Sequence, residues 1–268
     1  THKPEVSGSI PLPATKIMNS LISNKKIYGI IVCYNSAPAI EELYNRLDKT
    51  LFDKIFFFDD NSTDNSYEVA KKFDWTLIKN EKNLGHGGNL KKAIQTAFED
   101  GADYAVEIHA DNQYDPNSVK FAKEFFEKDF DLIIGSRFKK KNPFLRDGMP
   151  FLRYFTNKIM STFTSLLLNI KLTEFHTGYK IFSRNFAQKV PYLNCSNNYL
   201  FSFQVLLQAK YFNLKYDEIS ISSSYEGFKT SCNYSNGFIY LIQNFREITN
   251  FILARANIKN NNVFPKKN

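Results

Sequence analysis

The feature that most constrains this chain is the alternation of short apolar runs with segments of helical periodicity along its first half. The apolar runs lie at 27–34, 54–58, 75–78, 104–109 and 132–135. Between the first two, Ile40, Leu43, Tyr44 and Leu47 recur at the three- and four-residue spacing of a helix face. Short, wholly apolar strands that alternate with amphipathic helices are typical of βα units. The pattern predicts an α/β fold with a mostly parallel sheet flanked by helices.

Composition and charge narrow the classes of function. The chain has 268 residues, of which 43% are hydrophobic and 16% aromatic, enough for a sizeable core and too apolar for a disordered protein. A net charge of +8 indicates an anionic partner. No recognition-helix, RNP or zinc signature accompanies that charge, so we do not expect nucleic acid to be the partner.

Cysteine usage and targeting signals bear on location. The three cysteines, Cys33, Cys195 and Cys232, are far apart, which favours a reducing compartment over a disulfide framework. We find no signal peptide, and no uncharged apolar run reaches the ~18 residues of a membrane span. We therefore expect a cytoplasmic protein, with contact at the cytoplasmic face of a membrane left open.

The chain divides into four segments. Residues 1–25 are Pro-rich and predict a weakly ordered extension, and residues 26–230 predict the α/β domain. Residues 231–258 contain a last helix that packs on the domain or on a membrane surface, and residues 259–268 read as a basic polar tail. Within the second half, helices are expected at 151–168, 184–190, 199–212 and 236–256, and strands at 178–183 and 216–222.

Polar side chains follow three of the predicted strands. They are Tyr34-Asn35, Asp59-Asp60 and His109-Ala110-Asp111. Ligands of parallel sheets bind beyond the carboxyl ends of the strands, so these clusters predict one crevice. A carboxylate such as Asp111, with Gln113 nearby, suits a hard divalent ion that bridges a diphosphate. Each cluster alone also fits an ordinary turn or cap, as does the glycine-rich segment 83–88.

Six segments together carry a family resemblance. They are Val32-Cys33-Tyr34-Asn35, Phe58-Asp59-Asp60-Asn61-Ser62-Thr63-Asp64, Asn83-Leu84-Gly85-His86-Gly87-Gly88, Ile108-His109-Ala110-Asp111-Asn112-Gln113-Tyr114-Asp115-Pro116, Gly135-Ser136-Arg137-Phe138 and Thr173-Glu174-Phe175-His176-Thr177-Gly178-Tyr179-Lys180. In this order they resemble the family 2 glycosyltransferases of GT-A fold, particularly the dolichyl- or polyprenyl-phosphate sugar synthases. The resemblance spans about residues 27–225. It implies a GT-A domain with a C-terminal helical extension.

The resemblance also implies a metal-dependent inverting sugar transfer from a UDP- or GDP-sugar, with Mg²⁺ or Mn²⁺ as the cofactor. The nucleotide-binding positions would be Val32, Tyr34, Asn35, Asp59, Asp60, Asn83, Gly85, Gly88 and Ala110. Asp111 would hold the metal on the diphosphate, with Gln113 nearby, and Glu174 would face the acceptor. Arg137, Arg153, His176 and Lys180 would lie on the side of the acceptor phosphate.

One departure from the pattern concerns the metal. His109 stands where the family has the first Asp of its metal motif. As a ligand it would favour Mn²⁺ over Mg²⁺; as a packed residue it would leave the ion to Asp111. The missing Asp also motivates a different reading, a non-catalytic nucleotide-sugar-binding or scaffold protein.

The resemblance implies that the acceptor would be a polyprenyl phosphate or a growing glycan. A sugar hydroxyl needs a base, for which Glu174 is the candidate, whereas a phosphate is already anionic and needs cations. The stretch 137–158 carries seven basic residues opposed only by Asp147 and interleaved with aromatics. It reads as a phosphate or headgroup site, or as a solvated charge run. The apolar positions of the two long helices are expected in the core first, with a bilayer surface as the alternative.

Overall fold

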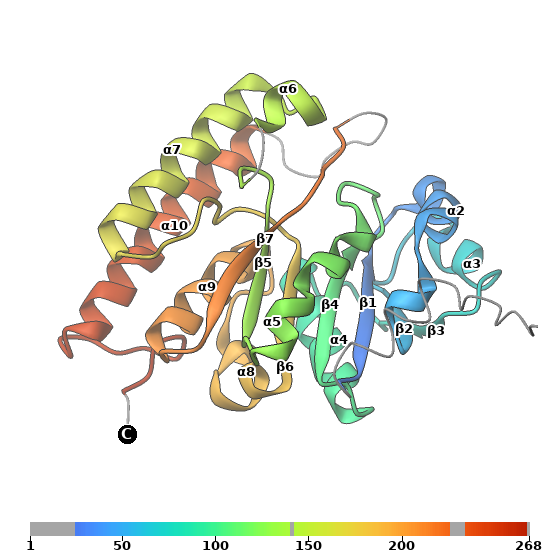
Figure 1. Ribbon diagram of the computed structural model, residues 1–268, viewed down its shortest axis with the longest axis horizontal. Coiled ribbons are helices and arrows are strands. Elements are labelled where there is room, and N and C mark those ends of the chain that lie inside the picture. The colour runs from blue at the N-terminus through green and yellow to red at the C-terminus, as the bar shows by residue number, and fades with distance from the viewer. Residues whose placement is uncertain (1–24, 140–141, 226–233, 267–268) are drawn as a thin grey trace, which may run out of the picture.

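The computed structural model describes residues 25–139, 142–225 and 234–266, and within these ranges the chain forms one seven-stranded sheet flanked by helices (Figure 1). The strands are β1 (Ile27–Cys33), β2 (Lys54–Asp59), β3 (Thr76–Lys79), β4 (Tyr104–His109), β5 (Leu132–Ser136), β6 (Lys180–Ser183) and β7 (Tyr216–Ser220). Their order is β3-β2-β1-β4-β6-β5-β7. The predicted α/β architecture is confirmed.

The pairing of the strands determines where the polar strand ends meet. β1 pairs in parallel with β2 and with β4, and β3 pairs in parallel with β2. β6 runs antiparallel between β4 and β5, and β7 is parallel to β5. Every strand except β6 therefore points the same way, and the carboxyl ends of β1, β2, β4 and β5 share one edge of the sheet.

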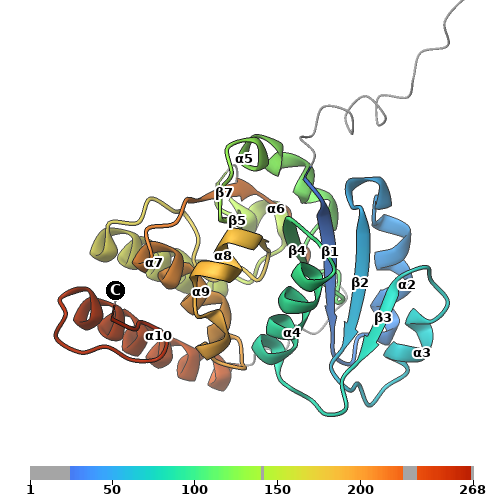
Figure 2. The same ribbon diagram turned by 90° about the horizontal axis from the view of Figure 1, so that it is seen from below.

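Helices cover both faces of the sheet. They are α2 (Ala37–Arg46), α3 (Ser66–Ala70), α4 (His86–Glu99), α5 (Lys123–Glu127), α6 (Pro143–Asp147), α7 (Phe151–Leu168), α8 (Arg184–Lys189), α9 (Leu200–Tyr211) and α10 (Tyr234–Arg255), with 3₁₀ turns at Lys49–Leu51, Pro116–Ala122 and Tyr192–Asn194. Alternate residues of β1 belong to two cores: Ile30 to the one that contains α4, α8 and α9, and Ile31 to the one that contains α2 and α5. Figure 2 shows α4 on one face and α2 with α3 on the other.

Helix α4 brings the glycine-rich segment into the site. Its buried face, with Leu90, Ala93, Ile94 and Ala97, follows helical spacing. The helix begins at His86, three residues before the expected start, so Gly87 and Gly88 form its first turn and do not precede it. The N-terminus of α4 lies close to the carboxyl end of β4, where His86 meets Glu107.

The C-terminal segment packs back on the domain. α10 lies against α9, and Ile248 and Phe251 are buried. Residues 259–266, expected as a polar tail, return to α9, where Phe264 is fully buried and the Tyr211 hydroxyl donates to Pro265 O at 2.7 Å. Apart from Lys25, the predicted N-terminal extension lies outside the described residues.

Helices α7 and α10 lie side by side along one end of the molecule (Figure 1), with the Phe163 and Phe245 rings 5.8 Å apart. Core packing was the first expectation for their apolar residues, and it is wrong for most of them. The exposed large apolar side chains of these helices and of α6 are Phe144, Leu145, Phe151, Leu152, Phe155, Ile159, Phe163, Leu166, Leu167, Phe238, Ile239, Ile242, Phe245 and Ile252. Periodicity predicted the helices, but these faces have no sheet to cover. Among the described residues, no helix combines the length and apolarity that a membrane span requires.

Candidate active site

Polar residues from three parallel strands meet at the carboxyl edge of the sheet. Tyr34 and Asn35 follow β1, Asp59 ends β2 with Asp60 directly after it, and Asp111 follows β4 by two residues. Each of these strand ends turns through an asparagine in the left-handed region, with φ of 52° at Asn35, 58° at Asn61 and 58° at Asn112. Asparagine tolerates this conformation better than most residues, so the sequence itself favours the turns that form the crevice.

The two acidic residues at the end of β2 differ in role: Asp60 makes structural hydrogen bonds, and Asp59 keeps an oxygen available to a ligand. Oδ1 of Asp60 accepts from Asn80 Nδ2 and from Leu84 N, both at 2.8 Å, which ties β2 to the turn before α4. Asp59 accepts from Ser62 N through Oδ2, while its Oδ1 is buried without a hydrogen-bond partner among the described residues. A buried acceptor left unpaired is costly, so Asp59 has capacity for a ligand donor.

The other predicted nucleotide-binding residues differ in exposure. Val32 and Ala110 are buried, and Tyr34 is 49% exposed. Asn35 accepts from Thr63 N at 2.8 Å, and the exposed Asn83 accepts from Gly85 N at 2.9 Å.

Gly85, which precedes α4, and Gly88, in the first turn of α4, let other parts of the chain approach closely. Gly85 has φ +79°, and a Cβ there would approach Asn197 O to 2.6 Å; a Cβ at Gly88 would lie 2.9 Å from Leu84 Cβ. The close approach of the 196–198 loop explains Gly85 without a phosphate.

Asp111 is half-buried in the turn after β4, where its Oδ1 accepts from Gln113 N at 3.0 Å. A carboxylate with an amide oxygen nearby is a donor set that suits Mg²⁺ or Mn²⁺. These two residues fit the ion that the sequence predicts.

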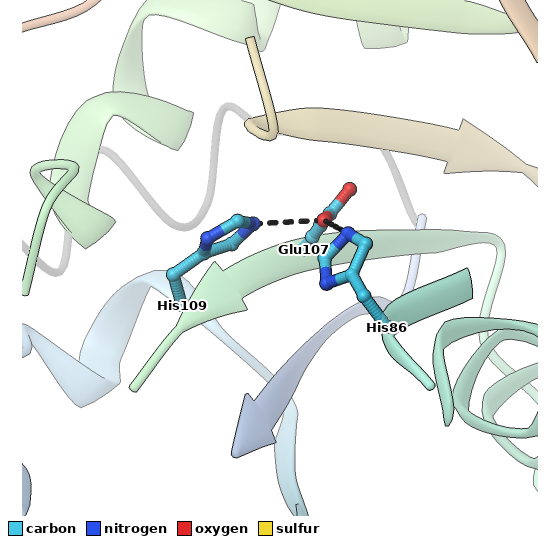
Figure 3. Close-up of side chains that lie close together, drawn as sticks. All are labelled: His86, Glu107 and His109. Carbon is cyan, nitrogen blue, oxygen red and sulfur yellow. Dashed lines mark hydrogen bonds and ion pairs between the residues drawn. The ribbon is translucent and has the colours of Figure 1, made fainter. Parts of the chain in front are cut away.

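His109 is turned toward Glu107, which precedes it by two residues on the same face of β4 (Figure 3). His109 Nε2 lies 2.9 Å and His86 Nε2 lies 3.5 Å from Glu107 Oε1. Burial alone would raise the pKa of Glu107, but hydrogen bonds from His109 and His86 outweigh it and lower that pKa to about 2. Against the opposing effect of burial, the same bond raises the pKa of His109.

Sequence reasoning missed Glu107 and left His86 unassigned. The signal that could have found Glu107 was a charged residue inside an otherwise apolar strand, on the same face as a histidine. His86 is brought to the pair by tertiary structure, because it lies at the start of α4.

The acceptor side is built around a buried ion pair. Glu174 is fully buried, and its carboxylate accepts from the backbone N of Arg137 at 2.7 Å and from Arg137 Nε at 2.8 Å. The Arg137 guanidinium also donates to the Tyr225 hydroxyl. The sequence placed Arg137 on the side of the acceptor phosphate and made Glu174 the candidate base for a glycan acceptor; in the structure the two side chains pair with each other inside the protein.

His176 and Lys180 are also directed inward, because the segment that carries them leads into the central strand β6. Burial lowers the pKa of Lys180 to about 8, and its ammonium donates to Thr177 O. Burial lowers the pKa of His176 to about 3, so the ring is neutral at pH 7, and its Nδ1 lies 3.4 Å from the Tyr240 hydroxyl. Neither side chain offers an exposed cation to an acceptor phosphate.

The basic run 137–158 does not form one exposed patch. Arg146 pairs with Asp147, and Lys139 donates to Glu218 O. Lys140 and Lys141 lie outside the described residues. Arg153 and Lys158 remain on α7, over the rings of Tyr225 and Phe138 at 5.7 and 5.3 Å.

Comparison with known proteins identifies the family of this chain. The family model for glycosyl transferase family 2 matches residues 29–190. The chain belongs to this family. It is a glycosyltransferase, and two of its curated relatives are named as dolichyl- or dolichol-phosphate sugar transferases, the branch that the motifs indicate.

Two of these relatives carry informative names. The UDP-N-acetylglucosamine–dolichyl-phosphate N-acetylglucosaminyltransferase of Methanococcus voltae is 28% identical over 222 residues, which are 76% of this chain and 88% of the relative. The dolichol-phosphate mannosyltransferase of Pyrococcus furiosus is 30% identical over 141 residues, 50% of this chain and 38% of the relative.

Among solved structures, glucosyl-3-phosphoglycerate synthase from Mycobacterium tuberculosis, in complex with Mn²⁺, UDP and glucosyl-3-phosphoglycerate, has a TM-score of 0.65 at 13% identity. The match covers 95% of this chain and 88% of that one. This likeness shows the GT-A fold, as the sequence motifs predicted.

Proposed function

We propose that this glycosyltransferase moves a sugar, with inversion, from a UDP- or GDP-sugar to a polyprenyl phosphate. An acceptor phosphate oxygen attacks the anomeric carbon while the bond from that carbon to the diphosphate breaks. The nucleoside diphosphate leaves with the bonding electron pair. The names of the dolichyl-phosphate relatives support this acceptor class.

The donor would bind at the carboxyl edge of β1, β2 and β4. Asp59 retains an unpaired, buried oxygen there, and Tyr34 offers a half-exposed ring on which a base can stack. Asp59 ends β2 and Tyr34 follows β1, and these two strands lie next to each other in the sheet.

Asp111 and Gln113 would hold Mg²⁺ or Mn²⁺ against the diphosphate. When bound, such an ion neutralises the charge that develops on the leaving group. His109 directs Nε2 at Glu107, which supports the reading in which Asp111 holds this ion without it. We expect His109→Ala to leave the preference between Mg²⁺ and Mn²⁺ unchanged; a shift toward Mg²⁺ would restore His109 as a ligand of the same ion.

The observation that carries the choice of acceptor is the buried Arg137–Glu174 pair. A glycan acceptor needs a base to remove a hydroxyl proton, and Glu174 was the candidate. Its carboxylate is fully buried and already accepts hydrogen bonds from the Arg137 backbone and guanidinium, so it is poorly placed to contact an acceptor hydroxyl. A phosphate acceptor requires no such base.

The exposed apolar face of α6, α7 and α10 supports a lipid-linked acceptor. Soluble monomers rarely expose large contiguous apolar surfaces without a binding role. A shallow apolar hollow on α7 is lined by Lys158, Ile159, Thr162, Phe163 and Leu166. Cations beside aromatic and aliphatic side chains are the composition of a segment that lies at a membrane interface, so we include peripheral membrane contact in the proposal.

The test has two steps. First, a thermal-shift screen of UDP- and GDP-sugars with Mn²⁺ identifies the donor, since saturating ligand stabilises the folded state. Second, the chosen radiolabelled donor is incubated with a short-chain polyprenyl phosphate or with oligosaccharides. We expect label in the lipid fraction. Label in the oligosaccharide alone would show that the acceptor is a glycan and not a polyprenyl phosphate. Donor binding without transfer to either acceptor would favour the alternative, a non-catalytic nucleotide-sugar-binding protein.

A further inference from the structure

His86, Glu107 and His109 come together from two separate elements (Figure 3). His86 begins α4, and the other two lie on β4. One ligand atom from each lies within 4.8 Å of the others. Glu107 Oε1 lies 2.9 Å from His109 Nε2 and 3.5 Å from His86 Nε2. Two ligand atoms of a tetrahedral ion with bonds of about 2.0 Å are about 3.3 Å apart, so the two distances lie on either side of that value.

We propose that His86, Glu107 and His109 form a binding site for a divalent transition metal, distinct from the ion at Asp111. Two imidazole nitrogens and one carboxylate are ligands that Zn²⁺ and its neighbours prefer, whereas Mg²⁺ prefers oxygen. Three protein ligands leave one position for water or a substrate group.

A second observation points to a ligand. Glu107 is fully buried, and its Oε2 has no hydrogen-bond partner among the described residues. A buried carboxylate oxygen without a partner carries a desolvation cost that a metal ion would remove. The side chains of His86 and His109 are 14% and 17% exposed, so the cluster remains reachable from solvent.

The surroundings hold both rings in place. Tyr199 stacks on His86 with ring centroids 5.2 Å apart, and Tyr114 meets His109 edge-on at 5.2 Å. Gly178 lies so close to His109 that a Cβ there would approach Nε2 to 2.6 Å. Rings fixed in this way present their nitrogens with little loss of side-chain entropy on binding.

An ion here would join the N-terminus of α4 to the end of β4, two residues before Asp111. The buried ammonium of Lys180 and the positive end of the α4 dipole oppose a cation at this place. Metal ligands must be free of protons, so affinity should fall as the pH falls.

The test uses Co²⁺ as a spectroscopic probe on the full chain after treatment with a chelator, without nucleotide. We expect visible d–d absorption at one equivalent of Co²⁺, displaced by Zn²⁺ and not by Mg²⁺. Losing even an outer-shell partner costs about 10–100-fold in metal affinity, so His86→Asn should weaken Co²⁺ binding at least about tenfold. Asp74→Asn, an exposed substitution just before β3, is the matched control and should bind Co²⁺ as the wild type does.

Three results would overturn the proposal: no absorption in the wild type, unchanged binding in His86→Asn, or equal loss in Asp111→Asn, which would indicate one shared site. Circular dichroism verifies that each variant is folded, and Glu107→Gln repeats the test if His86→Asn is not. The sugar-transfer assay is independent of this titration, so failure of either proposal is visible without the other.

Discussion

Arg137 donates both its backbone N–H and its Nε–H to the carboxylate of Glu174, at 2.7 and 2.8 Å, with both side chains almost completely buried. This pair joins the end of β5 to the loop before β6. It converts two residues that the sequence assigned to the acceptor into one structural unit.

The first prediction concerns that pair. Removing one partner of a buried ion pair leaves an uncompensated charge, so Glu174→Ala should lower the free energy of unfolding by about 3–5 kcal/mol. Urea denaturation measures this, with the exposed Glu81→Ala as the control. Loss of turnover with unchanged stability would instead make Glu174 the acceptor base.

The second prediction concerns Asp111. Asp111→Asn should reduce sugar transfer by at least about a hundredfold, because transition-state charge is no longer neutralised. Stability should hardly change, since the hydrogen bond that the side chain makes among the described residues lies within its own turn. Asp74→Asn, an exposed substitution that removes a surface ion pair with Lys49 just before β3, is the control. Near-normal transfer by Asp111→Asn would show that Asp111 does not hold the metal.

The third prediction concerns the exposed face of α7. Leu152 and Leu193 are similarly exposed, at 52% and 54%, but only Leu152 lies on that face. Leu152→Ser should weaken sedimentation with anionic vesicles about fivefold, from about 1 kcal/mol of lost apolar burial. Leu193→Ser should bind like the wild type. Equal binding by all three proteins would contradict membrane contact through α7.

The fourth prediction is a pH dependence. Burial lowers the pKa of His176 to about 3, whereas an unfolded histidine titrates near 6.5. Below pH 6.5 the unfolded state therefore binds a proton that the folded state does not, and stability falls with pH until about 3. The contribution is about 1.4 kcal/mol per pH unit.

His176→Phe should remove this slope and keep the stacking on Phe203, whose ring centroid lies 5.9 Å away. Urea denaturation between pH 7 and pH 5 measures the difference between the two proteins. Parallel pH profiles would show that His176 titrates in the folded state as it does in the unfolded chain.

The fifth prediction compares two glycines. A Cβ at Gly178 would collide with the His109 ring, so Gly178→Ala should destabilise the fold by about 1–3 kcal/mol. Gly237 lies in α10 with no described atom within 4 Å of an added Cβ, and Gly237→Ala should stabilise by about 0.5–1 kcal/mol. Thermal unfolding distinguishes the two signs; stabilisation by Gly178→Ala would mean that His109 moves freely.

Local sequence signals predicted the sheet well because apolar runs of strand length have few alternatives. The strand at 104–109 and the helix at 151–168 have the expected bounds. The start of α4 was wrong by three residues, because Gly87 and Gly88 are helical where the 196–198 loop presses on them. These contacts come from a segment about 110 residues further along the chain, so no local sequence pattern could have predicted them.

The candidate site likewise has one part that the sequence predicted and another that only the tertiary structure determined. The alternation of strands and helices, with polar residues after each strand, determined from sequence alone that Asp59 and Asp111 would share one edge of the sheet. Tertiary structure alone decided that Arg137 and Glu174 neutralise each other, that Lys180 and His176 are directed inward, and that His86 joins Glu107 and His109. That the ends of parallel strands share one edge follows from the alternation of strands and helices, whereas pairing between buried charges depends on which distant segments meet in a low-dielectric interior.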